Sequence, residues 1–558
     1  MKLKNIFLSG IAIATLASCG EKMDYKEFSI YDTAYMQKKF ERAGGFLSTI
    51  YADLDSDFGN YSGATLASAT DESVYSHDGN AIESFFNGAW SASNPNSSIW
   101  TTCYHGIAYC NMFLDEFTGL EFNDYILDKN YQSEMYQYNN YQWEARFLRA
   151  YFYFELVRQY GDVPLITDNL PAEEASIQPR TPADEVFKFI DDECAAIKDN
   201  ITKDYGDLGA LAMNPSNNGR ANNLAVLALR ARAALYHASP LFNKANNRDL
   251  WQKAAELNKA VLDSCSARGM RLSSDYKGLF IGNTNWSDAN ATGEIIFGRR
   301  MPTENRTFET YNFPVGISGA GAGGGGGNCP TLNLVEAYED KVADKRFAQT
   351  IACNGDSWPN ANTVPLETFV GGLNGLPTAY ATPTGYYLKK YLTESVQIAG
   401  NGANNCKHVW VTFRLGEFYL NYAEALFNLA GDGYKAPTGF ASSATAAYYI
   451  NQIRRRAGLP NMATGLSATD FKAKYENERF IELAFEGHRF FDVRRWMEGE
   501  KYFKNIRGMR ITKNADGTFT ETPITVQNRL WENKMNLFPI PQSEIMKSGG
   551  VLTQNEGW

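Results

Sequence analysis

Paired stretches of helical periodicity constrain the fold of this 558-residue chain most strongly. In residues 222–236 and 250–265, and again in 415–429 and 446–457, apolar residues recur at helical spacing. Alanines stand at several of the positions where the helices of a pair would cross closely. Each such hairpin buries its apolar face only against its neighbour, as tetratricopeptide-like units do. The sequence therefore predicts a mainly α-helical fold with a scaffold of tetratricopeptide-like hairpins.

Two stretches of the chain lack this periodicity. They are residues 61–97 and residues 278–405, and the second is rich in Gly, Asn, Thr and Pro. Long loops on a rigid frame usually carry function. We therefore expect these stretches to form an irregular, loop-rich ligand-binding lobe, with the helical scaffold mainly in residues 98–277 and 410–558.

Residues 478–496 predict one further helix, with an apolar stripe beside a row of glutamates at Glu478, Glu482 and Glu486. Three like charges in one row repel by a few tenths of a kcal/mol per pair unless nearby cations neutralise them. Four arginines are close enough in sequence to do so: Arg479, Arg489, Arg494 and Arg495. The segment is expected to be a core helix with an ion-pair network.

The literal sequence of residues 478–496 resembles the C-terminal hallmark of the SusD/RagB family, the nutrient-binding lipoproteins of bacterial outer membranes. Further segments that resemble this family follow one another in the family's order: 143–164, 414–424, 450–460, 537–545 and 552–558. The resemblance implies a scaffold of helical hairpins with a loop-rich second lobe. It also implies binding and import rather than catalysis. The expected partner is a SusC-like, TonB-dependent outer-membrane transporter that the protein caps like a lid.

The N-terminus predicts export and lipid anchoring. Lys2 and Lys4 precede an apolar run over residues 6–16, which is too short for the roughly 20 residues of a membrane-spanning helix. Small residues before Cys19 resemble a lipobox, so residues 1–18 are expected to be a lipoprotein signal peptide and Cys19 the acylated (palmitate-bearing) first residue. An ordinary secretory signal with an incidental cysteine is the alternative. Residues 19–558 are expected to form one unit, anchored at the cell outer membrane and facing outside.

The net charge argues against nucleic-acid-binding proteins, and the cysteine count bears on disulfide bonds. The net charge of −10 and the pI of about 5.3 disfavour nucleic-acid binding. Removing Cys19 leaves seven of the eight cysteines, an odd number. We expect buried free thiols, and the residues leave open one disulfide among Cys329, Cys353 and Cys406.

No catalytic or cofactor motif stands out. The five histidines show no metal-ligand spacing, and no Cys-x-x-Cys or Gly-x-Ser-x-Gly occurs. The glycine-rich residues 319–327 contain Gly-x-Gly-x-x-Gly, but outside a βαβ unit this indicates a flexible loop, one that could close on a ligand. The row of glutamates has a spacing that glycoside hydrolysis could use, but a buried structural role is favoured. We expect no catalytic residue, no metal site and no cofactor, and leave open only a structural Ca²⁺ ion.

Aromatic residues remain as candidate ligand contacts. Sugars present C–H faces that stack on aromatic rings, while planar polar side chains bridge their hydroxyl groups. Trp90 and Trp286 stand among polar, turn-forming residues, which favours exposed rings. Tyr311 and Phe313 precede the glycine run and could form an opposite wall. Asp71 could bind sugar hydroxyls or cap a turn.

The resemblance and these residues together predict a surface lipoprotein that binds an oligosaccharide or polysaccharide and delivers it to the transporter, a role in polysaccharide utilisation. One alternative is a peptide-binding import lipoprotein of the same architecture, favoured by a cleft of carboxylates and backbone groups without exposed tryptophan. A surface glycoside hydrolase and an adhesin using the helical repeats are further alternatives. The sequence does not identify the glycan or its linkage.

Overall fold

The computed structural model describes residues 32–96, 99–203, 205, 219–285, 293–317, 323–359 and 364–558. The predicted signal peptide, Cys19 and Trp286 lie outside these residues. Among the residues described, no helix is long and apolar enough to cross a lipid bilayer.

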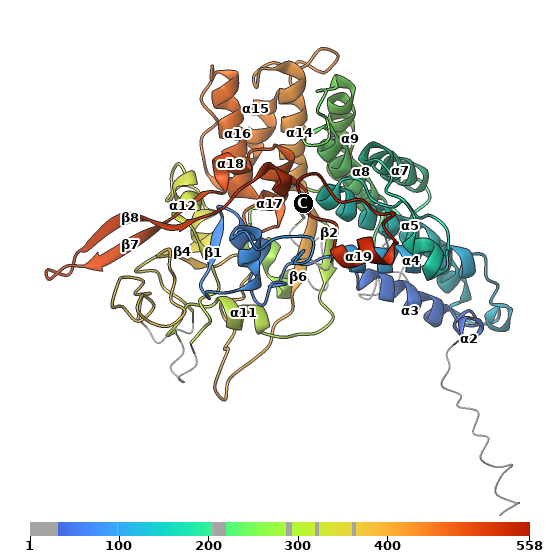
Figure 1. The fold of residues 1–558 in the computed structure, drawn as a ribbon, viewed down its shortest axis with the longest axis horizontal. Coiled ribbons are helices and arrows are strands. Elements are labelled where there is room, and N and C mark those ends of the chain that lie inside the picture. Colours follow the sequence, from blue (N-terminus) through green and yellow to red (C-terminus); the bar gives the residue numbers. More distant parts are fainter. Residues whose placement is uncertain are drawn as a thin grey trace, which may run out of the picture.

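Antiparallel helices pack side by side to form the larger part of the molecule (Figure 1). The longer ones, in chain order, are α3 (Phe40–Tyr51), α4 (Ile99–Glu116), α5 (Tyr131–Tyr160), α7 (Ala183–Ile197), α8 (Asn223–Ala238), α9 (Arg248–Ala267), α14 (Leu415–Ala430), α15 (Ala446–Ala457), α16 (Ala468–Glu482) and α17 (His488–Arg495). The pairs α8/α9 and α14/α15 confirm the predicted hairpins, and α9 packs against α14 to join them. The fold is mainly α and tetratricopeptide-like, as predicted.

Local signals set the ends of these helices. The Asn222 side chain accepts a hydrogen bond from the Ala225 N–H at the start of α8, and Thr445 caps α15 in the same way. Gly431 follows α14 in the left-handed conformation that favours glycine at a helix end. Alanines of α8 and α9 are completely buried, which lets the two helices approach closely: Ala225, Ala228, Ala231, Ala254 and Ala255.

Short elements make up the rest of the described chain. The short helices are α2 (Thr33–Met36), α6 (Ala172–Ser176), α10 (Gly282–Asn285), α11 (Thr307–Asn312), α12 (Leu332–Ala337), α13 (Phe347–Thr350), α18 (Gly499–Tyr502) and α19 (Gln542–Lys547), with 3₁₀ turns η1 (Leu66–Ala69), η2 (Ala81–Phe85), η3 (Asn123–Tyr125), η6 (Lys277–Phe280) and η7 (Asn533–Asn536). The strands pair in antiparallel twos: β1 (Ser73–Tyr75) with β3 (Asn328–Pro330), β2 (Ile295–Arg300) with β6 (Val409–Arg414), β4 (Ile351–Ala352) with β5 (Tyr387–Leu388), and β7 (Asn505–Lys513) with β8 (Phe519–Asn528). We call the described parts of residues 52–96 and 276–408 the loop-rich lobe.

The β7/β8 hairpin projects away from the helices (Figure 1, left). Backbone hydrogen bonds join the hairpin to the loop-rich lobe. The Met509 N–H donates to the Thr384 carbonyl at 2.8 Å, and the Val370 N–H donates to the Ile511 carbonyl at 2.9 Å. These two strands differ from the helical scaffold that was expected over residues 410–558.

The prediction of one continuous helix over residues 478–496 is wrong. Helix α16 ends at Glu482, and α17 begins at His488 after a turn in which Phe485 and Gly487 have positive φ. Contacts with the rest of the protein replace helical hydrogen bonds here. Arg414 Nη2 donates to the Glu482 carbonyl at 2.8 Å, and the Phe485 N–H donates to the Glu72 carboxyl group at 3.2 Å.

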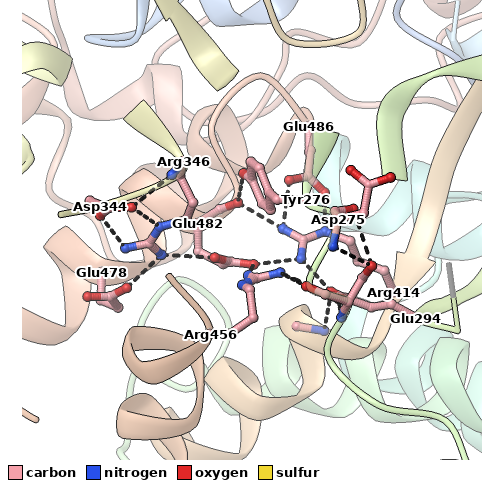
Figure 2. A network of polar contacts seen from close by, with 12 residues as sticks. Asp275, Tyr276, Glu294, Asp344, Arg346, Arg414, Arg456, Glu478, Glu482 and Glu486 are labelled. Atoms are coloured by element: carbon pink, nitrogen blue, oxygen red, sulfur yellow. Dashed lines mark hydrogen bonds and ion pairs between the residues drawn. The ribbon is translucent and has the colours of Figure 1, made fainter. Parts of the chain in front are cut away.

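A buried network of arginines and carboxylates lies where helices α14–α16 meet the loop-rich lobe (Figure 2). Glu482 is at its centre and accepts from Arg346 Nη1 at 2.9 Å, from Arg414 Nη1 at 2.6 Å and from Arg456. Burial alone would raise the pKa of Glu482, but the guanidinium groups of Arg456, Arg414 and Arg346 hold it well below its usual range. The network thus fixes the two parts of the molecule to each other.

The predicted ion-pair network is confirmed, but its predicted cations are wrong. The cations around the three glutamates come from elsewhere in the chain: Arg346, Lys390, Arg414, Arg454 and Arg456. Three of the four predicted arginines pair with other carboxylates: Arg479 with Asp492, Arg489 with Asp71, and Arg495 with Glu424. Arg494 instead lies over the ring of Phe490, 3.4 Å from its centroid.

Candidate functional site

Four aromatic side chains gather on the loop-rich lobe and form what we call the aromatic platform: Tyr75, His77, Tyr311 and Tyr380. The rings of His77 and Tyr380 are stacked with centroids 3.9 Å apart and planes only 8° apart, and Tyr75 stacks on His77 at 5.1 Å. Tyr311 is 40% exposed and Tyr380 56% exposed. Two tyrosine rings are therefore open to solvent beside a fixed aromatic stack.

The end of the glycine run holds this platform in place. His77 Nε2 lies 2.7 Å from the Gly325 carbonyl oxygen, so this nitrogen donates. A Cβ at Gly326, whose φ is +77°, would lie 2.0 Å from the Tyr380 carbonyl oxygen. The Gly326 N–H donates to the carbonyl of Phe313 at 3.0 Å. Residues 323–327 are thus packed against α11, while residues 319–322 of the predicted flexible loop lie outside the described residues.

A second glycine permits the close approach of two rings. At Gly63, whose φ is +96°, a Cβ would lie 2.2 Å from the Tyr75 hydroxyl oxygen and 3.2 Å from the Tyr311 ring. The Tyr75 hydroxyl donates to the Ser62 carbonyl at 3.3 Å. Burial, with Tyr311 nearby, raises the pKa of Tyr75 to about 12, so its hydroxyl stays protonated at neutral pH.

A polar pocket of about 440 Å³ adjoins the platform at Ser62. Its lining includes carboxylates, amides, hydroxyls and one guanidinium group, notably Asp53, Asp55, Ser56, Asn60, Tyr61, Asn96 and Arg299. The Arg299 guanidinium donates to backbone carbonyls of residues 52 and 54, so the loop that carries these side chains is anchored to β2. Such planar polar groups beside exposed rings suit a ligand with many hydroxyl groups.

This loop also contains one buried carboxyl group. Asp57 accepts from the Leu66 N–H at 2.6 Å through one oxygen. Burial raises the pKa of Asp57 to about 7. The group therefore titrates near neutrality within the same segment as the pocket-lining residues 52–56 and 60–62.

Comparison with known proteins agrees with this architecture. The SusD family model matches residues 293–558, and a second model, described as "Starch-binding associating with outer membrane", matches residues 30–235. The chain belongs to the SusD/RagB family. Among curated SusD-like proteins, it is similar to the SusD-like protein P2 of Formosa agariphila, with 25% identity over 424 residues, 74% of this chain and 73% of that protein.

Solved structures of SusD-like proteins share the fold. A SusD-like protein from Bacteroides fragilis superposes with a TM-score of 0.74 and 23% identity, covering 95% of this chain and 99% of that chain. A laminarin-binding SusD-like protein superposes with a TM-score of 0.62 and 21% identity, covering 94% and 100%. At such identities these likenesses show the fold alone.

The prediction that Trp90 is an exposed ring is wrong for this SusD family member. Trp90 is only 4% exposed, and its Nε1 donates to the Pro95 carbonyl at 2.9 Å. Its ring packs edge-on against Phe85, Phe538 and Trp558 at 4.8 to 4.9 Å. The polar neighbours in sequence form a turn around the indole, so no face is left for a ligand.

Phe313 and Asp71 are also buried, which contradicts their predicted contact with a ligand. Phe313 packs edge-on against Trp358, with centroids 5.2 Å apart, beneath the glycine run. Both oxygens of Asp71 accept from Arg489. Of the predicted ligand contacts, Tyr311 is the one that the structure places on the platform, and Trp286 lies outside the described residues.

His77 and Tyr380 of the platform were not among the ligand contacts predicted from the sequence. Side chains alternate between the two sides of an extended segment, so Tyr75 and His77 point to the same side. This spacing was the one signal in the sequence that connects these two residues. Tyr380 is more than 300 positions from His77 in the chain, so no local pattern connects the two residues.

Other predictions concern chemistry. The cysteines in the described part of the chain are all free, so no disulfide joins Cys329, Cys353 and Cys406. The three glutamates of the row are buried among cations, which confirms the structural role favoured over glycoside hydrolysis.

Proposed function

We propose that this SusD family member is a lipid-anchored surface protein that captures a glycan on the aromatic platform and delivers it to a TonB-dependent outer-membrane transporter. The observation that carries the proposal is the pair of exposed rings, Tyr311 and Tyr380, beside the stacked His77 and next to a polar pocket. The description of the family model that matches residues 30–235 names starch binding, and this supports the ligand class.

The physical basis is stacking combined with hydrogen bonding. Sugar C–H faces pack on the open tyrosine rings, and hydroxyl groups reach the carboxylates and amides of the pocket. Each sugar would bind weakly, and repeated units would add affinity. Weak contacts of this kind allow release into a transporter. The protein acts as a binding protein rather than an enzyme, in line with the buried state of the glutamate row.

The membrane attachment rests on Cys19 and on the family. The matching family description includes association with the outer membrane. Acylation of Cys19 would supply the anchor, and a partner transporter would receive the ligand. Uptake that is unchanged after deletion of that transporter would contradict the delivery step.

Native affinity electrophoresis tests the glycan proposal. The chain from residue 20 is run through gels that contain plant, host and microbial polysaccharides. Retardation by one polysaccharide, lost in Tyr380→Ala and weakened in Tyr311→Ala, is the expected result. Tyr448→Ala is a matched control, because Tyr448 is 49% exposed but lies on α15. Equal loss in the control, or retardation untouched by both platform variants, would contradict the proposed site.

A peptide ligand is the second candidate, and two observations favour it. No tryptophan among the described residues is fully exposed, and the pocket contains two aspartates. A basic peptide would pair with these carboxylates, and its binding would weaken at high salt, whereas glycan stacking would persist. Migration unchanged by every polysaccharide, with binding to a peptide mixture that salt abolishes, would decide for the peptide.

A further inference from the structure

Three side chains with metal-binding atoms converge in the loop-rich lobe. Glu309 comes from α11, and Cys406 and His408 from the segment that leads into β6. The His408 Nε2 lies 3.1 Å from Glu309 Oε2 and 3.5 Å from Cys406 Sγ, and this sulfur lies 3.3 Å from Glu309 Oε1. All three side chains are buried.

These separations match those of donor atoms around one zinc ion. With Zn–N and Zn–O bonds of about 2.0 Å and a Zn–S bond of about 2.3 Å, tetrahedral geometry puts the donors roughly 3.3 to 3.6 Å apart. Sulfur, imidazole nitrogen and carboxylate oxygen are also the ligand types that zinc accepts, whereas Ca²⁺ takes oxygen ligands. Neither the atom types nor the distances require rearrangement of the backbone.

The backbone holds the three ligands rigidly. Asn305 and Cys406 exchange N–H to carbonyl hydrogen bonds of 3.0 and 3.1 Å, and the Met301 N–H donates to the His408 carbonyl at 2.9 Å. These bonds extend the β2/β6 pairing. The His408 ring packs edge-on against Phe58 at 5.2 Å. The site is therefore formed before any ion arrives.

The charges of the cluster also suit a cation. Glu309 is completely buried, and within the described part of the chain its ion pair is with His408 and with no lysine or arginine. His408 balances this charge only when its ring is protonated, and the Thr393 N–H, which donates to Glu309 Oε1 at 3.2 Å, carries no net charge. Zn²⁺ bound by this carboxylate, a neutral imidazole and a thiolate gives a neutral group, with the thiol proton released to the buffer.

We propose that Glu309, Cys406 and His408 bind one Zn²⁺ ion, with water in the fourth position. Asn404 and Asn405 next to Cys406 are exposed, so the path from solvent is short. The ion ties α11 to the start of β6. Since α11 also carries Tyr311, zinc steadies one ring of the platform, but zinc binding itself does not depend on the identity of the ligand captured there.

Metal titration of the chain from residue 20, prepared with a non-thiol reductant, tests the proposal. One Zn²⁺ per chain is expected by calorimetry. Co²⁺ in its place is expected to show a thiolate-to-cobalt charge-transfer band and the intense visible bands of tetrahedral coordination. Cys406→Ser loses the charge-transfer band and weakens Zn²⁺ binding at least tenfold. Cys353→Ser, which removes a half-buried thiol outside the cluster, leaves the charge-transfer band and the Zn²⁺ affinity unchanged.

Two measurements keep the test decisive if Cys406→Ser fails to fold. Saturating Zn²⁺ raises the melting temperature of the unmodified chain by several degrees, and His408→Asn removes this rise. Anomalous diffraction at the zinc edge places a peak within bonding distance of all three donor atoms. A folded, unmodified chain that binds no Zn²⁺, binds Co²⁺ without the charge-transfer band, or shows the peak elsewhere overturns the proposal.

Discussion

The Asp71 carboxylate and the Arg489 guanidinium, 418 residues apart in the chain, form a two-bond ion pair of 2.9 and 2.7 Å. Asp71 belongs to the loop-rich lobe and Arg489 to α17, and both are buried. The pair therefore joins the lobe to the helices. We predict that Asp71→Asn destabilises the protein by about 3–5 kcal/mol, because it leaves a buried guanidinium without its partner. Denaturant unfolding measures this, and exposed Asp78→Asn is the control. A change below about 0.5 kcal/mol in Asp71→Asn would contradict the assignment.

Glu482→Gln is also expected to lower the free energy of unfolding by about 3–5 kcal/mol, since it removes the charge that three arginines share. Glu339→Gln provides the comparison. Glu339 pairs with Lys474 and Arg454 but is partly exposed, so its removal should cost about 1 kcal/mol or less. Equal losses of unfolding free energy in the two variants would show that burial does not decide how much these ion pairs contribute to stability.

Glu72 should make stability fall as pH rises. Burial, together with the nearby Asp71, raises the pKa of Glu72 from 4.5 to about 8. Between these pH values the folded protein holds a proton on Glu72 that the unfolded chain has lost. The contribution of Glu72 to the free energy of unfolding is therefore full below pH 4.5 and is lost as pH rises through about 8. Glu72→Gln keeps an acceptor for the Phe485 N–H but does not titrate. We expect the unfolding free energy of the unmodified protein, relative to this variant, to decrease from pH 5 to pH 8. A flat or rising difference would refute the buried, protonated state of Glu72.

Trp90→Ala should act on stability and not directly on ligand binding. Loss of a buried indole is expected to cost about 3–5 kcal/mol. Tyr380→Ala, at an exposed position, should change stability by less than about 0.5 kcal/mol yet abolish retardation by the glycan. Unfolding curves and affinity gels measured on both variants separate the two effects. The reverse pattern would restore Trp90 as the ligand platform.

Gly326→Ala should displace Tyr380, because the new Cβ would meet its carbonyl oxygen. Gly371→Ala is the matched control, with φ +87° and open space around the added methyl group. Both variants carry roughly 1–2 kcal/mol of backbone strain. Only Gly326→Ala is expected to weaken retention on the affinity gel. Equal retention in the two variants would mean that Tyr380 does not contribute to the site.

Much of the fold could be predicted because its signals are local. The hairpins α8/α9 and α14/α15 follow from periodicity and from alanines at the crossing points, and the structure adds the caps Asn222 and Thr445 at the starts of α8 and α15. The candidate site was less predictable, because exposure of a ring depends on which distant segments cover it. Trp90 shows this directly: its neighbours in sequence are polar, but Phe538 and Trp558 from the far end of the chain bury it.

The sequence by itself determined the mainly helical scaffold, the presence of an ion-pair network and the SusD/RagB resemblance, since each is carried by residues close together in the chain. The tertiary structure alone decided which cations pair with Glu482, where α16 ends, how His77 stacks on Tyr380, and that Glu309 lies beside Cys406 and His408. These relationships join residues up to several hundred positions apart. Their geometry depends on burial and pairing in the folded protein, and such contacts leave no period or spacing in the sequence.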